Sequence, residues 1–155
     1  MRMFKVLLLI LMLSPVCFAA GDVEFPKAAG AGYVNDFAQV IDPGTRSDIL
    51  QLLTSLEKKT SVEIAVVTLA TTAPLDSKSY AVELFNKWGL GKKGYDNGAL
   101  ILFVKDDKRI EVEVGYGLED ILTDGYIGRT LDENAIPFFK KGKYAEGLYM
   151  LSTII

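Results

Sequence analysis

Two runs of consecutive apolar residues constrain the fold of this chain more than any other feature of its sequence. Residues 62–69 form a β-branched run and residues 99–104 form a second apolar run. Short runs with this composition are typical of strands that are buried on both faces. Between them, Asp76 is placed to cap a stretch in which apolar residues recur at intervals of three and four as far as Trp88. That spacing predicts an amphipathic helix whose apolar face, Trp88 included, packs into the core.

Further elements are predicted on both sides of this strand–helix–strand unit. Asp42 followed by Pro43 is typical of the start of a helix. Residues 109–114 alternate between apolar and charged side chains, which predicts the second strand of a hairpin near the edge of a sheet. The remaining helices are expected near residues 43–59, 124–137 and 143–155. Together these elements predict an α/β fold in which helices cover both faces of a mixed sheet.

The first 19 residues have the anatomy of a secretory signal peptide. A basic start is followed by a short apolar run and then by small residues up to Ala19. The apolar run is shorter than the roughly 20 residues that a membrane-spanning helix needs. We therefore expect cleavage after Ala19 and a periplasmic or secreted location. Residues 20–32, rich in glycine and alanine, are expected to form an extended, poorly ordered lead-in to a single domain over residues 33–155.

The composition excludes several classes of chemistry. The chain of 155 residues has no histidine, and its one cysteine, Cys17, lies in the predicted signal peptide. The mature protein therefore has no histidine base, no thiolate nucleophile and no histidine or cysteine ligand for zinc. Carboxylates, amides and hydroxyls remain, and these oxygen ligands suit Ca²⁺ or Mg²⁺. The net charge is −3 without a basic patch, so nucleic acid is not an expected partner.

Acidic and amide residues gather in the loops that flank the predicted hairpin. Asp96 and Asn97 precede the strand at 99–104, and Glu119 follows the strand at 109–114. Antiparallel pairing brings the start of one strand beside the end of the other, so these residues are expected to meet at one sheet edge. They predict an oxygen-ligand site for Ca²⁺ or Mg²⁺.

Two further expectations accompany this site. Four glycines are expected to leave the backbone open around it: Gly94, Gly98, Gly115 and Gly117. Asp106 and Asp107 are expected at the tip of the hairpin, away from the site. The alternative interpretation is that each acidic loop is an ordinary turn or cap, because Asp, Asn and Gly are the residues that turns favour.

Several segments together resemble the TPM-domain family, and the resemblance covers about residues 32–155. The most specific segments contain W-G-L-G, D-N-G and G-Y-G-L-E. The segments that carry the resemblance are 34–41, 64–68, 87–91, 94–100, 106–109 and 114–119. The family includes a plant thylakoid-lumen protein linked to photosystem II repair and many bacterial envelope proteins. Many bacterial members continue into a transmembrane helix, so membrane association is expected if this sequence is part of a longer chain.

The resemblance implies a three-layer α/β/α sandwich around a mixed β-sheet and a divalent cation in a shallow acidic depression. It also implies a weak acid phosphatase activity of the kind attributed to the plant branch. The positions of this chain that match the family's acidic and amide positions are Asp36, Asp96, Asn97, Asp106, Asp107, Glu119 and Asp124.

Three functional hypotheses follow. The first is an exported divalent-cation-binding module that assists the assembly or maintenance of envelope or membrane proteins. The second is a metal-assisted acid phosphatase, although no histidine acid is available and Lys92 and Lys93 are the only obvious basic residues near Asp96. The third is a non-catalytic protein-interaction domain whose acidic loops are solvated turns.

Overall fold

The computed structural model describes residues 23–28 and 33–155, so the predicted signal peptide and part of the lead-in lie outside the described residues. Four strands form one sheet in the order β1-β2-β3-β4. Their bounds are β1 Val34–Asp36, β2 Glu63–Leu69, β3 Gly98–Val104 and β4 Arg109–Val114. The first three strands are parallel, and β4 pairs antiparallel with β3. The sheet is therefore mixed, and β4 is an edge strand, as the sequence predicted.

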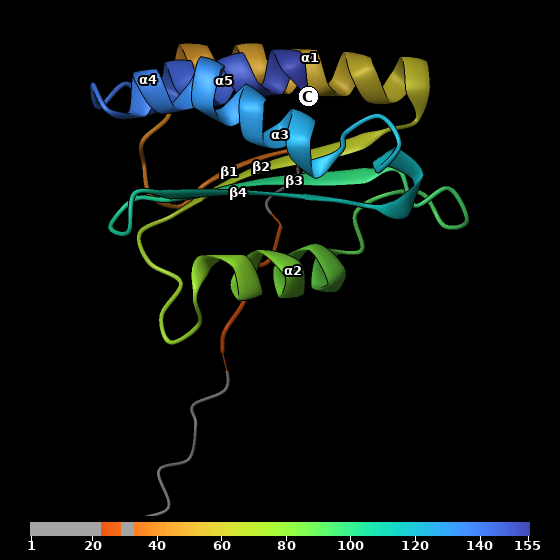
Figure 1. Ribbon diagram of the computed structural model, residues 1–155, viewed down its shortest axis with the longest axis horizontal. Helices are drawn as coiled ribbons and strands as arrows, with labels where there is room; N and C mark the ends of the chain where they lie inside the picture. The colour runs from red at the N-terminus through yellow and green to blue at the C-terminus, as the bar shows by residue number, and fades with distance from the viewer. Residues whose placement is uncertain (1–22, 29–32) are drawn as a thin grey trace, which may run out of the picture.

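Helices lie on both faces of this sheet (Figure 1). The helices are α1 Pro43–Thr60, α2 Ser77–Trp88, α3 Asp124–Thr130, α4 Ile136–Phe139 and α5 Tyr144–Ile154, with a 3-10 turn at Tyr116–Leu118 and a π-helical turn, η2, at Leu131–Ala135. In Figure 1, α2 lies below the sheet and the others lie above it. The predicted α/β class is confirmed, with helices on both faces as a three-layer arrangement requires.

The starts of α1 and α2 follow the predicted caps. The side chain of Asp42 accepts a hydrogen bond from the Thr45 N–H at 3.0 Å, and that of Asp76 accepts one from the Ser79 N–H at 3.0 Å. The Thr45 hydroxyl also donates to Asp42, at 2.6 Å. Hydrogen bonds from the Thr45 hydroxyl and N–H lower the pKa of Asp42, and those from Ser79 lower the pKa of Asp76, because they favour the charged carboxylate. The caps satisfy N–H groups that have no partner within the helix.

Alternating side chains of β2 and β3 divide the core into two layers. Ile101 and Phe103 face α1 and α5, while Leu100 and Leu102 face α2. The Phe103 ring lies 5.0 Å from the Phe139 ring and 4.8 Å from the Tyr144 ring, centroid to centroid. Because β3 is buried on both faces, its sequence is a continuous apolar run.

The edge strand β4 has one apolar face and one charged face. Its valines and isoleucine pack against the larger core layer. On the other face, Glu111 accepts a hydrogen bond from the Ser77 hydroxyl at 2.6 Å, and Glu113 forms an ion pair with Lys78 at 2.6 Å. The alternation that predicted a one-sided strand therefore arises because α2 covers this face of β4 with polar contacts.

Two elements differ from expectation. Strand β1 was not predicted, because three residues are too few for a periodic pattern, and it forms by pairing with β2. The helix expected over 124–137 is instead three consecutive pieces, α3, η2 and α4. Pro137 lies inside α4, near its start, a position at which a helix does not need the missing N–H.

The expected burial of Trp88 is correct only in part. Its side chain is half-buried and packs against the α2 core layer. The indole N–H donates to the backbone oxygen of Pro26 at 2.9 Å, and the ring of Phe25 lies 4.6 Å from that of Tyr80. The described part of the lead-in is therefore packed along α2.

Within residues 23–28 and 33–155, no helix is both long and apolar enough to cross a membrane.

Candidate functional site

The hairpin brings Asp96 and Glu119 together as its register predicted. Ala99 at the start of β3 pairs with Val114 at the end of β4. Asp96 and Glu119 consequently line one cavity of about 360 Å³, which also has Glu113 and Tyr116 in its wall. In Figure 1 this end of the hairpin lies at the right, opposite the β3–β4 turn.

A second cavity of about 350 Å³ lies alongside the first and is also lined by Glu113 and Glu119. Asp124, at the start of α3, lines this second cavity, together with Lys78. We call the four carboxylates that line the two cavities the acidic edge: Asp96, Glu113, Glu119 and Asp124. Lys78 is the only lysine or arginine that lines either of these two described cavities, and it is paired with Glu113. The acidic edge therefore attracts cations.

Glycines hold the two loops of the acidic edge against each other. The Gly117 N–H donates to the Asp96 backbone oxygen at 3.1 Å. A Cβ atom on Gly115 would lie 2.1 Å from that same oxygen, and one on Gly117 would lie 2.0 Å from the Tyr95 backbone oxygen. The expectation that Gly115 and Gly117 leave the backbone open was wrong. They allow two backbone segments to close on each other, which fixes Asp96 relative to Glu119.

Gly98 has the same role, whereas Gly94 does not. A Cβ atom on Gly98 would lie 2.3 Å from the Leu90 backbone oxygen, so this position too permits close backbone packing. Gly94 has a φ of +84° and open space around it, and it is glycine because L side chains rarely adopt that backbone conformation.

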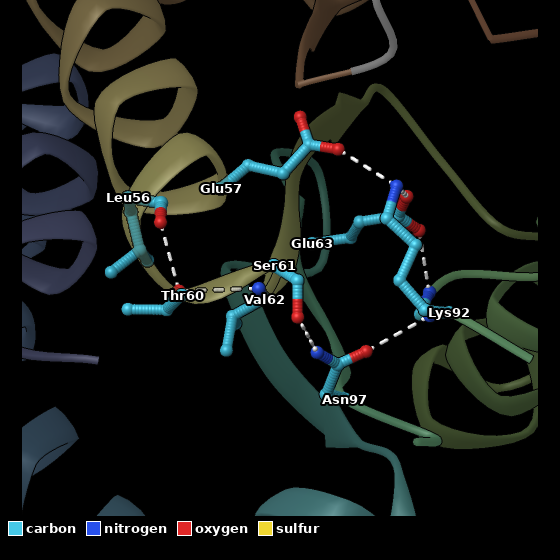
Figure 2. Close-up of polar contacts among 9 residues, drawn as sticks. Leu56, Glu57, Thr60, Ser61, Val62, Glu63, Lys92 and Asn97 are labelled. Atoms are coloured by element: carbon cyan, nitrogen blue, oxygen red, sulfur yellow. Dashed lines mark hydrogen bonds and ion pairs between the residues drawn. The ribbon is translucent and has the colours of Figure 1, made fainter. Parts of the chain in front are cut away.

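Asn97 is engaged in the framework of the fold (Figure 2). It is 7% exposed, its Oδ1 accepts from the Lys92 N–H at 2.9 Å, and its Nδ2 donates to the Ser61 hydroxyl at 3.0 Å. These contacts join the end of α1 to the loop before β3. Both polar atoms of the predicted ligand are thus already hydrogen-bonded.

Lys92 belongs to the same cluster and is not free to face the acidic edge. Its ammonium forms ion pairs with Glu57, at 2.8 Å, and with Glu63, as Figure 2 shows. The hydrogen bond to Glu57 and, to a smaller extent, the hydrogen bond to Glu63 raise the pKa of Lys92. Partial burial acts to raise the pKa of Glu63, but the hydrogen bonds from Lys92 and the Gly91 N–H outweigh it and lower that pKa.

We expect Asn97→Ala to reduce the free energy of unfolding by about 1–3 kcal/mol, because it leaves two partly buried partners without hydrogen bonds. Asn97→Asp should cost less, since a carboxylate accepts from the Lys92 N–H and the Ser61 hydroxyl can turn to donate. Urea denaturation of the three proteins measures the difference. Equal losses for the two variants would contradict this framework role.

The other predicted residues lie at the opposite end of the sheet. Asp36 ends β1, and its carboxylate accepts from the Val40 N–H at 3.0 Å and the Ile41 N–H at 2.9 Å, and from the Thr68 hydroxyl at 2.5 Å. It fixes the connection from β1 to α1. Asp106 and Asp107 occupy the β3–β4 turn, as the hairpin geometry predicted. The seven predicted residues therefore separate into two groups that cannot share one ion.

The carboxylates at the acidic edge suit only one kind of cation site. Within residues 23–28 and 33–155, no three His, Cys, Asp or Glu side chains are grouped closely enough to hold a metal ion. Asp96 and Glu119 line one cavity without an ion pair among the described residues. One or two carboxylates suit a hydrated divalent cation that keeps several waters, as Mg²⁺ commonly does. They do not make a closed calcium cage.

Glu113 is the residue at this edge that sequence reasoning missed. It lies on the charged face of β4, together with Glu111, and the alternation of residues 109–114 was used only to predict a one-sided strand. The available signal was its position one residue before the end of β4, because the register of the hairpin places that end beside Asp96.

The chain is similar in sequence to chloroplastic proteins of plants. A chloroplastic UPF0603 protein of Oryza sativa is 26% identical over 118 residues, which is 76% of this chain and 40% of the relative. A chloroplastic UPF0603 protein of Arabidopsis thaliana is 25% identical over 118 residues, 76% of this chain and 41% of the relative. The chain thus spans about 40% of the length of the curated relatives it matches.

Solved bacterial structures share the fold. The N-terminal domain of a protein from P. gingivalis has a TM-score of 0.72 and 33% identity, covering 77% of this chain and 76% of that one. A protein of Bizionia argentinensis has a TM-score of 0.61 and 25% identity, covering 73% of this chain and 77% of that one. The TPM domain family matches residues 34–155, all the described elements from β1 to α5. The chain therefore belongs to the TPM-domain family.

Proposed function

We propose that this domain is an exported divalent-cation-binding module that takes hydrated Ca²⁺ or Mg²⁺ at the acidic edge. The observation that carries the proposal is that Asp96, in the loop before β3, and Glu119, in the loop after β4, line the same cavity at the open end of the hairpin. The glycine contacts between their loops hold this arrangement in place before any ion binds. A site that is already formed does not have to spend binding energy on ordering its ligands.

The surface beside the acidic edge supports a role in binding another protein. Tyr95, Tyr116 and Ile121 are 71%, 82% and 72% exposed, and Tyr116 lines the same cavity as Asp96. Tyrosine side chains combine an apolar ring with a polar tip and are enriched at protein interfaces. We infer that the cation and these side chains together assist the assembly or maintenance of envelope or membrane proteins.

An extracytoplasmic location is part of the proposal. It rests on the signal-like residues 1–19 and is compatible with the chloroplastic relatives. Acid phosphatase activity has less support. The cavity that contains Asp96 and Glu119 has three carboxylates in its wall and no lysine or arginine, so it repels a phosphate group. Lys92 is held in ion pairs with Glu57 and Glu63.

The proposal predicts that Ca²⁺ or Mg²⁺ raises the melting temperature. A cation that binds only the folded state stabilises it by about 2.7 kcal/mol at a hundredfold excess over its dissociation constant. Asp96→Asn and Glu119→Gln should each remove most of that shift, because each takes away one of the two carboxylates in their shared cavity that form no ion pair among the described residues. Calorimetric melting with and without millimolar cation measures it.

The matched control is Asp106→Asn, a similar exposed aspartate at the far end of the hairpin. It should leave the shift nearly unchanged. If Asp106→Asn abolishes the shift and Asp96→Asn does not, the site lies at the other end of the sheet. If neither cation moves the melting temperature of the unaltered protein, the acidic loops are solvated turns and the domain binds partners without a metal.

A further inference from the structure

A third cavity, of about 370 Å³, lies between the start of β4 and the segment α3–η2–α4–α5. It is at the end of β4 opposite the acidic edge, because its wall includes Arg109 and Ile110 at the first positions of that strand. A volume of 370 Å³ has room for roughly ten groups of the size of a water molecule, each about 30 Å³. It also falls within the range of small-molecule sites.

The wall of this cavity is mainly apolar. Five half-buried side chains contribute to it: Ile110, Leu131, Ile136, Phe139 and Tyr144. The rings of Phe139 and Tyr144 lie 6.0 Å apart and both pack on Phe103 beneath them. This aromatic wall is therefore fixed by the core, and an apolar ligand would remove its exposed surface from water.

The rim of the cavity is basic. Lys108, Arg109 and Lys140 line it, against one carboxylate, that of Asp132. None of the three cations forms an ion pair within residues 23–28 and 33–155, whereas Lys78, Lys92 and Lys143 do. An apolar wall with unpaired cations at its mouth is complementary to a ligand that has an apolar body and an anionic head.

Two features of the local backbone contribute to the wall of this cavity. The π-helical turn η2 contributes Leu131 and Asp132 to the wall, and such turns are frequent at functional sites. Gly128 of α3 also lines the cavity, and a Cβ atom placed on it would meet nothing within 4 Å. We therefore expect a larger side chain at position 128 to occupy part of the cavity.

We propose that this cavity binds a medium-chain aliphatic carboxylate, with the hydrocarbon chain on the Phe139–Tyr144 wall and the carboxylate at the basic rim. Arg109 supplies the planar donor pair that suits a carboxylate, and the lysines at positions 108 and 140 supply further positive charge. This site lies apart from the acidic edge and does not depend on the function proposed there.

Calorimetric titration of the whole chain with decanoate, below the concentration at which decanoate forms micelles, tests the proposal. Saturable binding to one site is expected, with no detectable binding of acetate, which lacks the apolar body. Decyltrimethylammonium, of equal chain length and opposite charge, should bind at least about tenfold more weakly, as the unpaired cations repel it. Decyl phosphate, included as a second anion, should not bind more tightly than decanoate.

Two substitutions in one helix provide a matched pair. Gly128→Leu should abolish decanoate binding by filling the cavity. Gly125→Leu, also in α3 with open space around it but outside the cavity wall, should leave binding unchanged. Should Gly128→Leu fail to fold, the double variant Arg109→Gln and Lys140→Gln, at exposed positions, should still weaken binding by about tenfold or more.

The proposal is overturned if decanoate does not bind, if the cationic amphiphile binds equally well, or if Gly125→Leu and Gly128→Leu have the same effect. Tighter binding of decyl phosphate would reassign the head group to a phosphate ester. Asp96→Asn should leave decanoate binding intact, so the outcome here is separate from that of the cation experiment.

Discussion

Replacing Phe103 by alanine should lower the free energy of unfolding by about 3–5 kcal/mol, the usual cost of deleting a buried large aromatic side chain. Phe103 is 1% exposed near the end of β3. Its ring contacts those of Phe139 and Tyr144, so the substitution leaves a void between the sheet and two helical segments. Surrounding side chains can collapse only partly into such a void, because β3 is held by strands on both sides. Urea denaturation with a constant m-value measures the loss.

Phe37 is a matched control for this substitution. It is the same residue type but is 42% exposed, and its described hydrogen bond is made by the backbone N–H to the Thr68 oxygen. Phe37→Ala should cost less than about 1 kcal/mol, as expected for a surface position. Equal losses for Phe103→Ala and Phe37→Ala would mean that the core is not where the strand register places it.

The elements that could be predicted are those determined by local sequence. The continuous run of β3 and the alternation of β4 gave strands within one residue of those observed. The side chains of Asp42 and Asp76 each accept a hydrogen bond from the backbone N–H of the residue three positions later. This capping contact depends only on neighbours in the chain. The position of Asp96 beside Glu119 was also predictable, because antiparallel register follows from the hairpin itself.

The features that could not be predicted depend on contacts between distant segments. Strand β1 forms because β2 offers it a parallel edge. Trp88 is partly covered by Pro26 and its neighbours. The glycine- and alanine-rich composition of this segment had predicted a poorly ordered lead-in. The π-helical turn η2 has no signature that the periodicity of residues 124–137 could reveal. In each case the conformation is determined by contacts with distant segments, and the local sequence is only compatible with it.

The candidate site also has a part that could be predicted from the sequence and a part that could not. Sequence identified carboxylates and amides near the hairpin, but whether an oxygen is available depends on its hydrogen bonds. Asn97 and Asp36 are each committed to holding a loop, and Glu113 is paired with Lys78. The glycines at positions 115 and 117 were attributed to openness because their sequence cannot show which backbone they approach. Their actual role leads to the second prediction of large effect.

Gly117→Ala should reduce the free energy of unfolding by about 3 kcal/mol or more, at or above the upper end of the usual cost of overpacking. The added Cβ would lie 2.0 Å from the Tyr95 backbone oxygen. A backbone atom cannot move aside as the end of a flexible side chain can, so the loops must separate. That separation should also break the hydrogen bond from the Gly117 N–H to the Asp96 oxygen. Urea denaturation measures the loss of stability.

Gly125→Ala isolates the steric cause from the general effect of removing a glycine. Gly125 lies in α3, and an added Cβ would meet nothing within 4 Å. Alanine is favoured over glycine in helices, so this variant should be more stable by about 0.5–1 kcal/mol. The two substitutions are chemically identical and should act in opposite directions. Because Gly117 couples the loops that carry Asp96 and Glu119, Gly117→Ala should also reduce the cation-induced rise in melting temperature, while Gly125→Ala preserves it. A stable Gly117→Ala protein with an unchanged cation response would show that the loop contact does not position the acidic edge.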